Sequence, residues 1–253
     1  MATTTEIAAR KLGKITPRVD VRTLTLSRYI DRANLPDAPA AIDLTGHVAE
    51  WPMYANDRIG DCTTAAAAHM IEAWTAEAHG AAVEVTESAV LTAFDRVKIV
   101  DPQSGEEGAI ELDVLRDWRK HGVGHHRIGA FARVSTSDHR LVQAAAWIFG
   151  GLYIGLQLPL SAQYQETWDW NGSLTGDDRP GSWGGHAVDV VRYGPAGLTI
   201  VTWGSLKAMT WSFWDRYCDE AYCILSRDFL DGDRAPNGFD LAALRADLEL
   251  VTA

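Results

Sequence analysis

The stretch Asn56-Asp-Arg-Ile-Gly-Asp-Cys-Thr-Thr-Ala-Ala-Ala-Ala-His-Met70 decides the fold of this chain. The alanine-rich run that begins at Cys62 has apolar residues at three- and four-residue spacing, which predicts a helix. Asp61 stands at the N-cap position, and Gly80 is placed for the left-handed residue that often ends a helix. The sequence therefore predicts a long helix with Cys62 in its first turn.

A cysteine in the first turn of a helix is suited to act as a nucleophile. The positive end of a helix dipole lowers the pKa of a thiol, and the backbone N–H of such a cysteine has no partner within the helix. Asn56 is expected to supply a second donor to an oxyanion, and Gly60 to allow close approach of the chain. A buried structural thiol is the alternative for Cys62.

Hydrophobic periodicity and capping residues predict further helices in the first half of the chain. Thr86 opens a second helix that extends to about Val97, and a third, with its apolar face around Leu115, closes at Gly122. A fourth helix is expected over residues 137–147, capped by Ser135 or Ser137.

The second half is stranded. Short runs rich in β-branched and aromatic residues, bounded by Gly or Pro, predict strands at residues 152–158, 186–193, 198–203 and 222–225. Helices followed by strands predict an α+β fold with two lobes and a groove between them.

The segment Gly181-Ser-Trp-Gly-Gly-His186 places a histidine after a glycine-rich turn and at the start of an apolar strand. A strand end can hold a side chain rigidly toward a cleft, which makes His186 a candidate base. A structural histidine is the alternative.

Together, Cys62 and His186 resemble the papain-like cysteine peptidases. In those enzymes the His and Asn follow the cysteine by about 130 to 150 residues, and here His186 and Thr202 follow Cys62 by 124 and 140. The run from His186-Ala-Val to Thr202-Trp-Gly resembles the strand pair that carries the family's histidine and asparagine. The resemblance spans about residues 46–230 and implies a papain-like fold, with a helical lobe that bears the nucleophile and an antiparallel β lobe.

The resemblance also implies a set of site residues. Cys62, His186, Asn56 and Thr202 take the catalytic positions, with Asn56 where the family has glutamine and Thr202 where it has asparagine. Substrate-binding positions are implied for Trp183, Trp203 and Gly60, with Trp203 one residue nearer than the family's tryptophan. A hydroxyl can accept an imidazole N–H but orients the ring less well than an amide. No metal or cofactor is implied.

The expected organisation has three parts. Residues 1–45, basic and interrupted by prolines, form an extended arm with a short helix near residues 26–33. The arm is expected to dock on the domain, with docking to a protein partner or removal as a pro-like segment left open. Residues 46–230 form the papain-like domain, helical over 46–135 and stranded over 136–230, and residues 231–253 form a tail with a short helix.

The function expected from the resemblance is a thiol hydrolase or acyltransferase that acts on peptide or amide bonds of a peptide or protein substrate. Two alternatives stay open: a catalytically inactive papain-fold binding or structural module, such as a phage or bacterial particle component, and a peptidoglycan endopeptidase. Distant bacterial or phage relatives in a reducing compartment are expected, because the disulfide cysteines of secreted members are missing.

Composition narrows the partners. The 253 residues carry 34 acidic and 23 basic side chains, a net charge of −11, without the basic patch that nucleic-acid binding requires. Neither a signal peptide nor an apolar run of spanning length is readable, which predicts a cytoplasmic protein without membrane contact, particle association being left open. Three cysteines are too few for a disulfide framework, and the histidines at 121, 125 and 126 lack the further ligands of a metal site.

Overall fold

The fold is built on helix α2, Cys62–His79, which is buried along most of its length. The computed structural model describes residues 10–28, 37–230 and 235–237. Gly80 ends the helix with a φ of 77°, as predicted. Asp61 occupies the N-cap position, as predicted, although its side chain makes no capping hydrogen bond.

The remaining helices follow the sequence pattern closely. Thr86 caps α3 by accepting a hydrogen bond from the Ala89 N–H, and the third predicted helix forms as α4. Asp138, rather than Ser135 or Ser137, caps α5. Helix α6 was not predicted. The bounds are α3 Glu87–Val97, α4 Glu111–Lys120, α5 His139–Phe149 and α6 Trp211–Tyr217.

The described strands form a seven-stranded antiparallel sheet in the order β4-β9-β5-β6-β7-β8, with β1 paired to β6. Its strands are β1 Ile42–Asp43, β4 Ile128–Arg133, β5 Leu152–Leu158, β6 Gly184–Gly194, β7 Gly197–Thr202, β8 Ser205–Thr210 and β9 Cys218–Ser226. A separate pair joins β2 Ile99–Val100 and β3 Glu107–Gly108. The four predicted strands are present as β5, β6, β7 and β9, and the six-residue strands β4 and β8 and the two-residue strands β1, β2 and β3 were missed.

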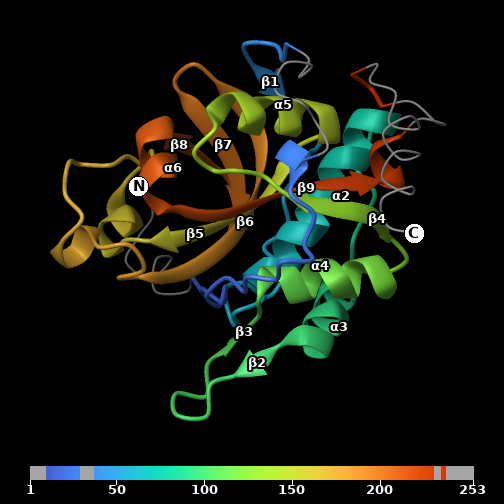
Figure 1. Cartoon of the computed structure of the whole chain (residues 1–253). Helices are drawn as coiled ribbons and strands as arrows, with labels where there is room; N and C mark the ends of the chain where they lie inside the picture. Colours follow the sequence, from blue (N-terminus) through green and yellow to red (C-terminus); the bar gives the residue numbers. More distant parts are fainter. Residues whose placement is uncertain (1–9, 29–36, 231–234, 238–253) are drawn as a thin grey trace.

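Figure 1 shows α2, α3 and α4 grouped on the right and β5 to β8 on the left, in agreement with the predicted α+β fold of two lobes. The candidate site lies where the two lobes meet, because α2 packs against β6 there. The sheet combines strands from both predicted lobes. Strand β4 lies within residues 46–135 and pairs with β9, which lies within residues 136–230.

The arm crosses between the two groups as the dark-blue trace of Figure 1. Its one described helical turn is η1, Leu26–Arg28. The rest of the helix predicted near residues 26–33 lies outside the described residues, as does nearly all of the 231–253 tail. No described helix has the length and apolarity needed to cross a membrane.

Candidate functional site

Cys62 and His186 come together where the lobes meet. Cys62 is the first residue of α2 and His186 lies near the start of β6, and each side chain is about 1% exposed. The Ala187 backbone N–H donates to Cys62 Sγ at 3.5 Å. The pairing expected from spacing is therefore a physical proximity, with the thiol against the strand that carries the imidazole.

The His186 ring is fixed from two directions. Its Nε2 lies 2.7 Å from Thr202 Oγ1, at the end of β7. Its face stacks on Trp203 with ring centroids 4.3 Å apart and an interplanar angle of 12°. Nδ1 is buried and has no hydrogen-bond partner among the described residues. Thr202 thus holds one ring nitrogen, and the other has no partner among the described residues.

The β7–β8 turn explains how Trp203 reaches the ring from a position one residue nearer than in the family pattern. Thr202 pairs with Ser205, so the loop has two residues, Trp203 with φ 44° and Gly204 with φ 68°. Positive φ at both central residues is the requirement of a type I′ turn. Trp183 stacks on Trp203 with ring centroids 5.3 Å apart, so both predicted tryptophans belong to the aromatic cluster that contains His186.

Asn56 is buried near the start of α2. Its Nδ2 donates to the Ile59 carbonyl at 3.4 Å, and its own backbone carbonyl accepts the Lys11 N–H at 2.9 Å. These contacts belong to the loop and the arm, and the oxyanion role of Asn56 stays a prediction.

Residues 11–15 of the arm, hereafter the covering segment, lie over the site. The Lys14 N–H donates to the Gly185 carbonyl at 3.1 Å, and the Trp203 Nε1–H donates to the Lys11 carbonyl at 3.1 Å. On the opposite side, the Ala109 N–H donates to the Gly13 carbonyl at 2.8 Å. The same five residues therefore contact both the β6 and β7–β8 side and the β3–α4 side of the site.

The covering segment fits closely at Gly13. A Cβ built on Gly13 would lie 1.8 Å from the Gly60 carbonyl oxygen, and one on Gly108 would lie 2.3 Å from the Gly13 oxygen. Contacts below 3.0 Å between a Cβ and backbone require the backbone to move. Gly60, predicted to permit close approach, thus permits the approach of the arm.

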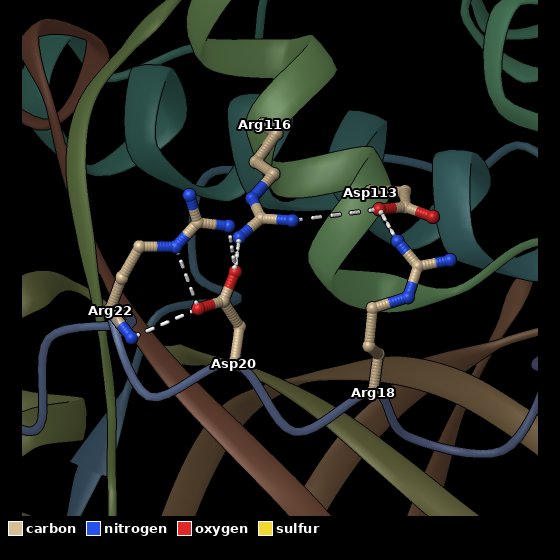
Figure 2. Close-up of polar contacts among 5 residues, drawn as sticks. All are labelled: Arg18, Asp20, Arg22, Asp113 and Arg116. Atoms are coloured by element: carbon tan, nitrogen blue, oxygen red, sulfur yellow. Dashed lines mark hydrogen bonds and ion pairs between the residues drawn. The ribbon is translucent and has the colours of Figure 1, made fainter.

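The arm is also anchored to α4 by ion pairs, shown in Figure 2. Arg18 Nη1 donates to Asp113 Oδ1 at 2.6 Å. Asp20 accepts from the Arg22 guanidinium at 2.7 Å and pairs with Arg116 of α4. Hydrogen bonds from Arg22, with a further one from Arg116, lower the pKa of Asp20. These contacts hold the chain that continues from the covering segment.

Coverage reverses the electrostatics expected at Cys62. Burial raises the pKa of the thiol to about 12, although hydrogen bonds from the Ala187 and Gly13 N–H groups oppose the rise. Burial also lowers the pKa of His186 to about 3. The predicted depression of the thiol pKa by the helix dipole is wrong for this conformation, because the loss of hydration outweighs the dipole. With the arm docked, the pair is a neutral thiol and a neutral imidazole.

The site also borders an open pocket. A pocket of about 310 Å³ borders Thr202 and Trp203 and is lined also by Gln163, Glu166 and Lys207. All three cysteines are free. Within the described ranges, no group of three His, Cys, Asp or Glu side chains is arranged to hold a metal ion.

Sequence reasoning missed Lys14 and the carboxylates around it, namely Glu111, Asp219 and Glu220. Glu111 looks like an ordinary acidic residue in the first turn of a helix. Asp219 and Glu220 follow Cys218 without a motif. The one local signal is a pair of acidic residues directly before the apolar run of β9.

Comparisons with known proteins place the fold. No protein-family model matches the sequence, and no curated protein matches it significantly. Among solved structures, xylellain, a cysteine protease from Xylella fastidiosa, is similar with a TM-score of 0.63 and 17% identity over 85% of this chain and 97% of its own. Procathepsin B S9 from Trypanosoma congolense has a TM-score of 0.60 and 11% identity over 89% of both chains.

A recombinant stem bromelain precursor is also similar, with a TM-score of 0.55 and 17% identity over 89% of this chain and 80% of its own. At these identities the likeness concerns the fold, and it confirms the papain-like architecture that the Cys62 and His186 segments predicted.

Proposed function

We propose that this papain-like chain is a thiol hydrolase of peptide or amide bonds, with Cys62 as nucleophile, His186 as base and Thr202 as the residue that orients the imidazole. The observation that carries the proposal is the position of His186, whose Nε2 lies 2.7 Å from Thr202 Oγ1 and whose Nδ1 is unpaired among the described residues, while the N–H of the next residue, Ala187, donates to the Cys62 thiol. Fold neighbours described as cysteine proteases support it.

The chemistry follows from these groups. The Cys62 thiol passes its proton to His186 as sulfur attacks the acyl carbon, and His186 then gives that proton to the leaving amine as the C–N bond breaks. Water, deprotonated by His186, attacks the thioester carbon, the C–S bond breaks to release the acid, and the proton on His186 returns to the Cys62 sulfur. An amine in place of water would give acyl transfer through the same thioester. The Cys62 N–H and the Asn56 amide are the proposed donors to the oxyanion.

We further propose that the covering segment keeps this site latent, so that the arm is a pro-like segment. A substrate carbonyl cannot reach Cys62 while Gly13 lies over the thiol, and burial holds the pair neutral. Among the fold neighbours, the procathepsin and the bromelain are precursor forms.

The test uses the full chain with Gly13→Val, whose added carbons would clash with the Gly60 carbonyl and displace the covering segment. The matched control is Gly46→Ala, because a Cβ on Gly46 meets nothing within 4 Å. On a quenched fluorescent casein, we expect Gly13→Val to cleave at least about tenfold faster than wild type, since the competent fraction rises.

Adding Cys62→Ser to Gly13→Val should abolish this cleavage. A Gly13→Val protein that is folded, has a Cys62 thiol open to alkylation and cleaves nothing would contradict the hydrolase and leave the inactive binding module. Equal cleavage by wild type and Gly13→Val would contradict latency.

A further inference from the structure

The Lys14 side chain enters a buried pocket beside the site. It is 0% exposed, and its Nζ lies 2.9 Å from Asp219 Oδ2 and 3.2 Å from Glu220 Oε1. Asp219 is further held by the Gln157 amide at 2.7 Å, and Glu220 by the Tyr222 hydroxyl at 2.8 Å. The pocket is therefore built by the body of the domain, and the arm supplies only the cation.

Glu111 is a third carboxylate aimed into the same space. It is fully buried, and neither of its oxygens has a hydrogen-bond partner among the described residues. A Cβ on Gly155 would lie 2.0 Å from Lys14 Cε and 2.8 Å from Glu111 Oε1. The glycine thus leaves a narrow channel for the lysine stem, and Glu111 faces that channel.

The pocket favours a cation. Burial lowers the pKa of Lys14, but the charges of Glu111, Asp219 and Glu220 together raise it above its ordinary value. Burial and the charge of Glu220 raise the pKa of Glu111 well above its usual range, and Lys14 opposes the rise. Buried carboxylates without a counter-charge are strongly destabilising. When the covering segment leaves, the vacated carboxylates favour another cation in its place.

The pocket adjoins the proposed nucleophile. Lys14 directly follows Gly13, whose N–H hydrogen-bonds to the Cys62 thiol, and the Glu111 charge is close enough to contribute to the pKa of Cys62. The Lys14 N–H donates to Gly185, the residue before His186. A side chain in the pocket therefore belongs to a residue whose backbone lies next to the reacting bond.

We infer that the carboxylate pocket formed by Glu111, Asp219 and Glu220 is a substrate pocket for a lysine side chain, which Lys14 occupies while the arm is docked. The catalytic use of the pocket rests on the proposed hydrolase, whereas its affinity for a primary alkylammonium does not. The narrow channel at Gly155 suits the unbranched lysine stem better than a planar guanidinium.

Binding is tested on the full chain with Lys14→Ala, which empties the pocket, using n-propylammonium as the probe for the missing atoms. We expect a saturable rise in the melting temperature of Lys14→Ala, with no rise for wild type and none with n-propanol. Should Lys14→Ala fail to fold, Gly13→Val vacates the pocket without altering it and serves for the same titration. An equal effect of propanol, or an equal rise in wild type, would overturn the pocket.

Turnover is tested in Gly13→Val with paired fluorogenic peptides that carry lysine or norleucine at each position near the scissile bond. Lysine should be preferred by roughly tenfold or more at one position, as expected for a hydrogen bond to a charged group. Glu220→Gln should reduce this preference, and the exposed Glu106→Gln should not. Equal rates for lysine and norleucine would overturn the pocket with the hydrolase intact. Propylammonium binding without any turnover would instead contradict the hydrolase.

Discussion

The contact between His186 and Thr202 is the departure from the family pattern that matters most at the residue scale. A threonine hydroxyl occupies the asparagine position and lies 2.7 Å from Nε2, while Trp203 covers the ring face. The ring is thus oriented by a shorter side chain and a stacked indole. Thr202 is therefore proposed to act as a positioning residue.

Replacing Thr202 with valine keeps the shape and removes the partner of Nε2. We expect the unpaired ring nitrogen to lower the free energy of unfolding by about 1–3 kcal/mol, measured by urea denaturation. In the Gly13→Val background, the pH at which turnover is half-maximal should also move. In the same background, Thr202→Asn should keep the pH of half-maximal turnover close to that of Gly13→Val alone. Thr199→Val, on the same strand, should leave this pH unchanged. An unaltered pH profile in Thr202→Val would show that the hydroxyl does not position His186.

Among the helices and strands, local signals predicted α2 to α5 and strands β5, β6, β7 and β9, whereas β4 and β8 form through pairing with their neighbours. Gly80 marks a helix end because glycine readily adopts a positive φ, and Thr86 marks a helix start because its hydroxyl accepts a backbone N–H. Strand β8 has few β-branched residues and forms because β7 pairs with it through a two-residue turn. Strand β4 is rich in Gly and Ala and is held by β9. Such pairing has no local signature.

The arm was predicted to dock, but its path was not readable from the sequence. Lys14 and Asp219 are 205 residues apart, and Arg18 and Asp113 are 95 apart. No spacing rule connects such pairs, so the four catalytic candidates could be named while the segment covering them could not.

The arm's ion pairs give a prediction at this scale. Removing the carboxylates of Asp20 and Asp113 with Asp20→Asn and Asp113→Asn should loosen residues 11–22 from α4. Amide hydrogen exchange in that stretch should accelerate, and added salt should accelerate it in wild type, because these pairs are partly exposed. The control Asp95→Asn removes an exposed pair with Lys98 elsewhere. Unchanged exchange in the double variant would mean that the glycine contacts alone hold the arm.

At the scale of the whole molecule, buried acids make stability depend on pH. Glu72 is buried on α2, where its Oε1 accepts the Tyr54 hydroxyl at 2.7 Å. Burial raises its pKa to about 7. A group with a raised pKa contributes its stability fully below its unfolded pKa, near 4.5, and loses that contribution as the pH rises through the folded value.

Glu72→Gln keeps the oxygen that accepts from Tyr54 and removes the titration. Relative to wild type, the variant should gain about 2 kcal/mol of unfolding free energy between about pH 5 and about pH 8. Urea denaturation at the two pH values measures this, with the exposed Glu106→Gln as a control that should show no such gain. A constant difference between Glu72→Gln and wild type across this range would contradict a neutral buried Glu72.

The Cys62–His186 pair and its cover by the arm are tested most directly by the rate at which iodoacetamide alkylates Cys62 as a function of pH. The reaction is followed by mass spectrometry on the full chain. Wild type should react negligibly, because burial keeps the thiol protonated. Gly13→Val should react rapidly near neutral pH, and adding His186→Ala should return its titration to about pH 8.5, the value of an ordinary thiol. A titration near pH 8.5 in both Gly13→Val proteins would contradict the Cys62–His186 pair.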